Sequence, residues 1–335
     1  MKLREQRIVR AMVVVLVILA LVAFARSVNW PETWRAMRAT SPGLFAAAAV
    51  VNLLSLALKG VRWWIFLRPI GVTSLGLALR ATFAGAALNN ILVANSGEAG
   101  RVILVSRAAH VASERVLATL ALERLFEFVG YVVLFAAAVS FLVLPPAING
   151  LRPAAFVALV VVIGLLFYLV RHPEQAELPT LEGEGLLHRA RHYGRGFLRT
   201  LTSISTGRRF AASLALSVVV WALQVATYQL TARAAHFDIS IVGTIAAILA
   251  VNMGFAMRAT PGNVGVFQMI YAVTTAAFGL DRDQATGVAF LIQIQQILPV
   301  TIIGLLASPG ILAEERRHKA RPDNILPGEP TPARD

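Results

Sequence analysis

Six long apolar segments run through the sequence, and they constrain the fold more than any other feature. They cover residues 11–25, 44–58, 116–144, 154–170, 210–232 and 285–307. Segments of this kind form helices in a lipid bilayer, where every backbone polar group must be paired internally. The shorter ones reach across the hydrocarbon core because flanking Lys and Arg side chains extend to the headgroups. The sequence therefore predicts an all-α polytopic membrane protein with six full spans.

The composition agrees with a membrane location. Hydrophobic residues make up 57% of the chain and charged residues only 15%, whereas soluble domains carry roughly 25% charged residues. The formal net charge of +13 comes from basic residues between the apolar segments, so we expect contact with membrane lipids and not with nucleic acid. The chain has no cysteine, which excludes disulfide bonds and Cys-ligated metal sites. We expect no cofactor and no metal ion.

The basic residues also predict the orientation. With a cytoplasmic amino terminus, 22 of the 31 Lys and Arg residues fall in cytoplasmic segments and 6 in segments on the opposite side. This bias follows the positive-inside rule. Both termini are therefore predicted to be cytoplasmic, in a multi-pass protein of the cell inner (plasma) membrane. Residues 23–25 also resemble a small-residue cleavage site, so a cleaved signal peptide stays open as an alternative to the first span.

Two further apolar regions are interrupted. The first, residues 75–112, breaks at residues 95–101 and leaves arms at 81–94 and 102–112. At ~1.5 Å per residue these arms reach only ~21 and ~16 Å into a core ~30 Å thick. This predicts a broken or re-entrant helical hairpin that opens from the cytoplasmic side.

The second interrupted region covers residues 239–280 and breaks at residues 258–263, where Pro261 and Gly262 stop a helix. Its arms are longer, so a hairpin and two full spans both stay open. Either arrangement returns the chain to the side from which it entered, and the predicted topology is unchanged.

The order of these elements predicts an inverted-topology repeat. Residues 1–145 form the first copy, with two spans, a hairpin and one span. Residues 146–310 form the second, which contains a basic cytoplasmic loop at 171–209, and residues 311–335 form a disordered tail. Interrupted segments at corresponding positions of such repeats mark midplane binding sites in transporters. We therefore expect the tips at Gly97 and at Pro261 and Gly262 to line a shared cavity.

Ionisable residues lie close to both breaks. Glu98 and Arg101 belong to the first, Arg258 precedes the second, and Glu123 and Arg124 lie deep in the following span. Charges at such depth are costly unless paired or hydrated, so they are candidates for function. Two structural alternatives stay open, an ion pair between Glu98 and Arg101 and a charge ladder that joins helices. Glu123 and Glu127 share one helical face deep in the span, so both are placed to partner Arg101 or Arg258.

Catalytic patterns are weak. The Asp281-Arg-Asp283 motif resembles the metal-binding pair of some glycosyltransferases, but it lies in a very short loop, and a helix-capping role is favoured. His188 and His192 have metal-ligand spacing but lie among arginines. The loop that contains them is either a basic amphipathic helix on the membrane surface or a solvated linker.

The interrupted segments resemble a known family. The motifs are Asn89-Asn90, Gly97-Glu98-Ala-Gly-Arg101, Glu123-Arg124 and Thr260-Pro261-Gly262-Asn263-Val-Gly265-Val-Phe-Gln268. Together they are similar to the signature segments of the lysylphosphatidylglycerol synthase transmembrane-region family, also called flippase-like domain proteins. The resemblance implies movement of lipids or lipid-linked precursors between leaflets. The chain departs from the family pattern at four positions, Val93, Asn95, Asn263 and Gln268, and at Gln268 the family often has a glutamate.

These observations lead to a functional hypothesis, an inner-membrane lipid transporter that moves an anionic lipid or lipid-linked precursor and is not itself an enzyme. The residues expected to contact the headgroup are Asn90, Gly97, Glu98, Arg101, Glu123, Arg124, Arg258, Pro261, Gly262, Gly265 and Gln268. The alternative is a non-transporting accessory protein for a glycosyl- or aminoacyl-transferase of the envelope, which would then be its partner. An enzyme acting on lipid is a weaker third possibility.

Overall fold

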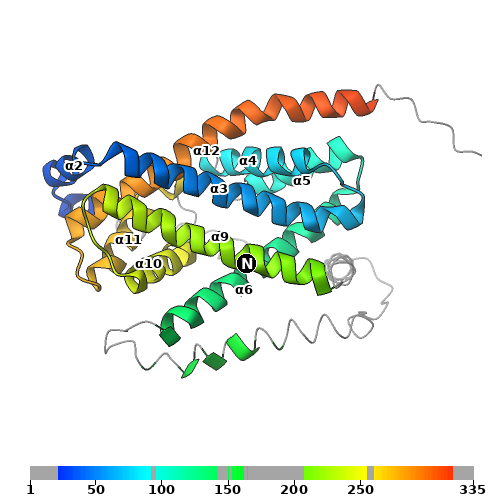
Figure 1. Ribbon diagram of the computed structural model, residues 1–335. Helices are drawn as coiled ribbons and strands as arrows, with labels where there is room; N and C mark the ends of the chain where they lie inside the picture. Colours follow the sequence, from blue (N-terminus) through cyan, green and yellow to red (C-terminus); the bar gives the residue numbers. More distant parts are fainter. Residues whose placement is uncertain are drawn as a thin grey trace, which may run out of the picture.

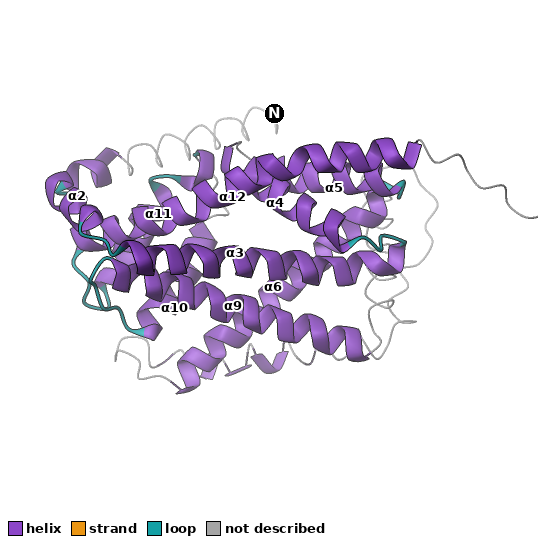
Figure 2. Cartoon of the chain, turned by 45° about the horizontal axis from the view of Figure 1, so that its top comes forward, coloured by secondary structure: helices purple, strands orange, loops and turns teal. Residues whose placement is uncertain are grey.

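The computed structural model describes residues 22–91, 96–141, 207–254 and 260–319, together with a few residues between 150 and 164. In these parts the regular structure is entirely helical (Figures 1 and 2). The α-helices are α2 (Trp30–Arg38), α3 (Pro42–Leu67), α4 (Leu75–Ile91), α5 (Ser96–Ala109), α6 (Ser113–Phe141), α9 (Gly207–Ala234), α10 (Ile241–Gly254), α11 (Val266–Ala276) and α12 (Arg282–Lys319). Two 3-10 turns, η1 (Arg68–Ile70) and η5 (Pro261–Asn263), join them. The all-α prediction is confirmed.

Three of the predicted spans are confirmed. The helical segments Pro42–Ile70, Arg208–Ala234 and Arg282–Ala307 are long and apolar enough to cross a membrane. Helix α6 has 29 residues and covers most of the predicted span at 116–144. The predicted spans at 11–25 and 154–170 lie mostly outside the described residues, so the total of six stays a prediction.

Helices α3 and α9 form an antiparallel pair at the centre of the bundle. Ser55 Oγ donates to the carbonyl of Val220 at 3.3 Å, and Arg62 Nη1 donates to Ser217 Oγ at 2.8 Å. Residue numbers thus rise along one helix as they fall along the other, and both figures show the two helices side by side. Small and hydroxylated side chains at these contacts allow close packing between membrane helices.

Helix α3 continues beyond the predicted end of its span. The sequence predicts a span at residues 44–58, extended by Trp63 and Trp64 as an interfacial pair, and places Lys59 and Arg62 in a cytoplasmic loop at 59–80. This loop assignment is wrong. The helix runs to Leu67, because no residue stops it before Pro69, which has no N–H to continue the α-helical hydrogen bonds. Lys59 and Arg62 therefore lie inside the bundle.

The first interrupted region forms a hairpin of α4 and α5, which pack against each other. The predicted break is displaced, because Ser96 to Arg101 form the first turns of α5 and are not a loop. Asn89 Oδ1 of α4 accepts a hydrogen bond from the backbone N–H of Gly97 at 2.9 Å, which satisfies a free donor at the start of α5. A Cβ atom on Gly97 would overlap the carbonyl oxygen of Gly85, so this close approach requires glycine.

The second interrupted region is also a hairpin. Helices α10 and α11 have 14 and 11 residues, and at ~1.5 Å per residue they reach ~21 and ~16 Å, too short to cross a core of ~30 Å. The turn between them uses positive φ angles of 59° at Gly262, 55° at Asn263 and 88° at Gly265, which glycine and asparagine tolerate best. Within the described residues both arms are short, which agrees with the hairpin alternative left open by the sequence.

The two hairpins lie at opposite ends of the bundle, and their tips meet. Helices α4 and α5 occupy the right half of Figures 1 and 2, and α10 and α11 the left half. At the junction, a Cβ atom on Gly262 would lie 3.5 Å from the carbonyl oxygen of Asn90. The inverted repeat itself stays a prediction, because its first span and much of the segment between α6 and α9 lie outside the described residues.

Helix α12 is longer than its predicted span. It continues to Lys319, so residues 311–319 of the predicted disordered tail are helical. The rest of that tail, like most of the basic loop with His188 and His192, lies outside the described residues.

Candidate functional site

A cluster of charged side chains joins α3, α5 and α6 inside the bundle. We call it the charge cluster; its members are Lys59, Arg62, Glu98, Arg101, Glu123, Arg124 and Glu127, linked by five ion pairs. On α6, Glu123 and Arg124 lie 10 and 11 residues after Ser113, which is ~15 to ~17 Å along the helix, a distance equal to about half the thickness of a bilayer core. At that depth an ion pair needs close geometry and additional contacts.

The most buried pair connects the hairpin to α6. Arg101 Nη2 donates to Glu123 Oε2 at 2.8 Å, and the two side chains are 10% and 6% exposed. The guanidinium carbon of Arg101 also lies 3.9 Å from the centroid of the Trp63 ring, whose indole N–H donates to Thr119 Oγ1 at 3.0 Å. The prediction that Glu123 partners Arg101 is confirmed, and the pair holds α5 against α3 and α6.

The second ion pair between this hairpin and α6, Glu98–Arg124, is more exposed to solvent. Arg124 forms ion pairs with Glu98 of α5 and, at 2.7 Å, with Glu127. The Arg124 side chain is 55% exposed and that of Glu98 is 27% exposed. Glu98 and Arg101 therefore each pair with α6, in place of the ion pair with each other that the sequence left open.

Lys59 and Arg62 were missed by the sequence analysis. Glu127 Oε1 lies 3.5 Å from Lys59 Nζ and 3.6 Å from Arg62 Nη2. The Arg62 side chain is fully buried, and within the described residues its Nε and Nη2 atoms have no hydrogen-bond partner. Lys59 and Arg62 are three residues apart directly after an apolar segment, a spacing that would place both on one face if the helix continued. The sequence analysis placed both in a loop instead.

The charge cluster has a formal net charge of +1, from four cations and three carboxylates. Exposure increases along it, from the buried Arg62 to Arg124, which is 55% exposed. A buried guanidinium with unused donors is costly, and Arg geometry suits the oxygens of a phosphate or carboxylate. The arrangement can therefore accept an anion that enters next to Arg124.

Two glutamines hold the second break. The backbone N–H of Gly265 donates to Gln268 Oε1 at 2.6 Å, Gln268 Nε2 donates to Gln293 Oε1 at 2.5 Å, and Gln293 Nε2 donates to the carbonyl of Gly262 at 2.7 Å. This amide relay begins at a backbone donor and ends at a backbone acceptor, so each side chain must both accept and donate. Gln268 is fully buried, and its amide is used within the protein.

Replacing Gln268 tests the amide relay. Gln268→Leu leaves the Gly265 N–H and Gln293 Oε1 without partners, and we expect it to destabilise the protein by about 1–2 kcal/mol. Gln268→Glu should cost at least as much, because an ionised carboxylate cannot donate to Gln293. The measurement is the thermal unfolding midpoint in detergent, with Gln284→Glu at the start of α12 as a control that keeps the wild-type midpoint. A wild-type midpoint for Gln268→Glu would contradict the relay.

Helix α12 also holds the tip of the first hairpin. Asn90 Nδ2 donates to Thr301 Oγ1 at 3.1 Å and to the carbonyl of Ile297 at 3.5 Å. A Cβ atom on Gly262 would lie 3.0 Å from Ile297 Cδ1, so Ile297 lies between the two tips. Gln293, Ile297 and Thr301 follow each other at four-residue spacing and share one face of α12.

The structure thus divides the predicted site residues into two groups. Glu98, Arg101, Glu123 and Arg124 meet in the charge cluster, with Gly97 at the adjacent start of α5. The residues at the hairpin tips and the amide relay are Asn90, Pro261, Gly262, Gly265 and Gln268. Arg258 lies outside the described residues. That all of these residues contact a substrate stays a prediction.

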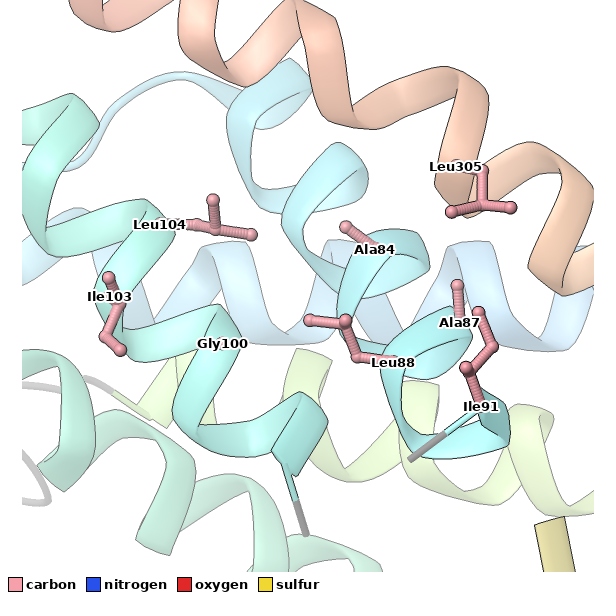
Figure 3. A pocket seen from close by; sticks show the side chains of 8 residues that line it. All are labelled: Ala84, Ala87, Leu88, Ile91, Gly100, Ile103, Leu104 and Leu305. Carbon is pink, nitrogen blue, oxygen red and sulfur yellow. The ribbon is translucent and has the colours of Figure 1, made fainter. Parts of the chain in front are cut away.

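A groove of about 240 Å³ lies on the first hairpin, beside α12 (Figure 3). Its lining is apolar and consists of Ala84, Ala87, Leu88, Ile91, Gly100, Ile103, Leu104 and Leu305. The lining includes no member of the charge cluster, and Gly100 and Ile103 lie on a different face of α5 from Glu98 and Arg101 by the 3.6-residue period of a helix. The groove and the charge cluster are therefore separate features, and the groove suits a hydrocarbon chain.

The Asp281-Arg-Asp283 motif is used to begin a helix. Asp281 Oδ2 accepts hydrogen bonds from the backbone N–H groups of Asp283 and Gln284, at 3.0 and 3.3 Å. Asp283 Oδ1 accepts from the N–H of Asn29 at 3.0 Å, which ties the start of α12 to the segment before α2. The predicted capping role is confirmed.

Comparison with known proteins agrees with the sequence motifs. The chain is 25% identical over 328 residues to a protein named Glycosyltransferase AglD from Haloferax volcanii, a match that covers 88% of this chain and 53% of AglD. The chain thus spans about half the length of this relative. A family model described as "Lysylphosphatidylglycerol synthase TM region" matches residues 9–304. The chain therefore belongs to the lysylphosphatidylglycerol synthase transmembrane-region family.

Proposed function

We propose that the protein is a flippase-like lipid transporter of the inner membrane, which moves an anionic lipid or lipid-linked precursor between leaflets. In this proposal the phosphate of the headgroup binds at the charge cluster, and the acyl chains stay in the surrounding lipid. The supporting observation is a positively charged cluster at membrane depth with unused guanidinium donors on Arg62. Intramembrane charges of this kind are expensive and usually serve function.

The exposure gradient suggests the role of each residue. Arg124, the most exposed cation of the cluster, makes the first contact with the phosphate. Glu98 is the carboxylate that the phosphate displaces, since both are anions that bind the same guanidinium. Lys59 and Arg62 then receive the headgroup at greater depth, while the buried Arg101–Glu123 pair positions α5.

Headgroup transfer requires the hairpin to move relative to α6, because both ion pairs of α5 end on α6. Displacement of Glu98 from Arg124 removes the more exposed of these two links. Rocking of one half of the bundle against the other is the usual mode of such transporters. The meeting of the two hairpin tips at Asn90 and Gly262 then couples movement at one end of the bundle to the other.

The test compares lipids that co-purify with wild-type protein and with Arg124→Gln, by mass spectrometry against bulk lipid of the same membranes. We expect one anionic lipid class to be enriched in the wild type and lost in the variant. Arg115→Gln, which removes an exposed cation on the same helix, is the matched control and should keep the enrichment. The enriched lipid is then followed across liposome bilayers, where Arg124→Gln should move it at least tenfold more slowly. Bulk composition in all three proteins, or a wild-type rate for Arg124→Gln, would contradict the proposal.

The second candidate is an accessory protein for an envelope glycosyl- or aminoacyl-transferase. It is favoured by the match to one half of a protein that is named a glycosyltransferase. Its distinguishing test is to shorten the loop between residues 171 and 206 while the spans are kept. An accessory protein that docks through this loop should lose function, whereas a transporter should keep its transport rate.

A further inference from the structure

A second basic pocket lies between the end of α3 and the start of α9. It has a volume of about 300 Å³ and is lined by Ile65, Arg68, Arg208, Arg209 and Ala212. Three of these five residues are arginines, from two helices far apart in the sequence. Nothing in the proposed transport cycle uses them, and the pocket lies six residues beyond Arg62 on α3, ~9 Å along the helix.

One arginine of the pocket, Arg68, is stacked on a tryptophan ring. The guanidinium carbon of Arg68 lies 5.0 Å from the centroid of the Trp64 ring, and the Trp64 indole N–H donates to the carbonyl of Thr73 at 2.8 Å. Arg68 is thus held in place before any ligand binds. Arg208 and Arg209 follow directly on the first residue of α9, and the first turn of that helix has no acidic residue. Arg68 and Arg208, one from each helical segment, line the same cavity, so an anion bound there would be attracted by both positive charges.

The pocket lies where two membrane spans end. The helical segments long and apolar enough to cross a membrane end at Ile70 and begin at Arg208, so we expect the arginines to lie near the depth of the lipid phosphates. Ile65 and Ala212 give the pocket an apolar side toward the hydrocarbon core. Basic pockets between membrane helices at this depth recognise phosphorylated headgroups. The positive-inside bias places this end of the bundle on the cytoplasmic side.

We propose that this pocket binds the phosphate of an anionic phospholipid of the cytoplasmic leaflet, as a site separate from the charge cluster. The phosphate oxygens accept hydrogen bonds from Arg68 and Arg208, and the first carbons of the acyl chains contact Ile65 and Ala212. The lipid would stabilise the contact between α3 and α9, because it touches both helices. This site does not require transport, so its test is independent of the test of the proposed function.

The test measures lipid-induced stabilisation of the full-length protein in phosphatidylcholine nanodiscs, with and without phosphatidylglycerol. We expect phosphatidylglycerol to raise the unfolding midpoint of the wild type. In Arg68→Gln/Arg208→Gln its apparent affinity should fall by about 25-fold, or about fivefold for each removed charge. The matched control is Arg38→Gln/Arg233→Gln at the other end of the bundle, where Arg38 also lies 5.0 Å from a tryptophan ring. The control should keep the wild-type response.

Two further measurements distinguish a bound lipid from free phosphate and from loss of folding. Inorganic phosphate replaces phosphatidylglycerol in one arm, and an equal stabilisation by free phosphate would overturn the assignment to a lipid. In the other arm, native mass spectrometry of the wild type counts retained phosphatidylglycerol, so a double variant that fails to fold does not remove the test. Equal retention of phosphatidylglycerol and phosphatidylcholine by the wild type, or an unchanged response of Arg68→Gln/Arg208→Gln, would contradict the proposal. Transport assays on Arg124→Gln report on the charge cluster alone.

Discussion

Replacement of Glu123 by leucine is expected to lower the free energy of unfolding by about 3–5 kcal/mol, the usual cost of removing one partner from a buried ion pair. Arg101 would then be left as a buried cation without its carboxylate, because its side chain is only 10% exposed. Its position is also fixed by the Trp63 ring and by Gly85, where a Cβ atom would overlap the Arg101 side chain. The guanidinium therefore cannot reach solvent by a small rearrangement. Unfolding in detergent, followed by circular dichroism, measures the loss.

The double variant Glu123→Leu/Arg101→Met separates the pair from the packing around it. Replacement of both partners by apolar side chains of similar size is often neutral, so this protein should recover most of the stability lost in Glu123→Leu. A double variant that is as unstable as the single one would show that the helix contacts, and not the ion pair, hold α5 against α6. Transport measured on the double variant then reports whether the pair has any part beyond holding the hairpin.

Glu127→Gln is expected to have the second-largest effect. It should lower the stability of the protein and raise its affinity for an anionic headgroup. Glu127 lies within 3.6 Å of both Lys59 and Arg62 and contacts Arg124 at 2.7 Å. Its loss should destabilise the protein by about 2–3 kcal/mol, less than a fully buried pair because its side chain is 17% exposed. The same change raises the formal charge of the cluster from +1 to +2. An anionic headgroup should consequently bind about tenfold more tightly, a gain of about 1.4 kcal/mol.

The measurement for Glu127→Gln is the unfolding midpoint in neutral lipid and in the anionic lipid that co-purifies with the wild type. The variant should be less stable than the wild type in neutral lipid and should gain more from the anionic lipid. If the anionic lipid stabilises both proteins equally, the carboxylate does not compete with the headgroup, and the charge cluster is not its binding site. Asp238→Asn, at an exposed position between α9 and α10, serves as the control for loss of a carboxylate.

Sequence reasoning found the parts of the charge cluster that belong to interrupted or deeply placed segments. Glu98, Arg101, Glu123 and Arg124 were identified because charges deep in an apolar segment need partners. The pairing was predicted only in part. Arg101 was one of the two partners given for Glu123, whereas the pairing of Glu98 with Arg124 was not predicted. Only the packing of α5 against α6 decides between these pairings.

Lys59 and Arg62 show why the rest was missed. In sequence they follow an apolar segment, and basic residues in that position usually mark the membrane surface. Their burial comes from α6 and α9, which lie 50 or more residues away in the chain and supply Glu127 and Ser217. The length of the second hairpin was similarly undecided from composition, because the apolar character of residues 239–280 does not reveal that α10 ends at Gly254.

The stripe of Gln293, Ile297 and Thr301 on α12 has a mechanical consequence. Gln293 holds the turn of one hairpin, and the next two turns of α12 hold Asn90 at the tip of the other. If α12 rotated about its own axis, Gln293 and Thr301 would move in the same direction around the helix. If α12 moved along its axis, both residues would shift by the same distance. Both hairpin tips are therefore anchored to one face of the same helix, so a movement of α12 would displace both of them.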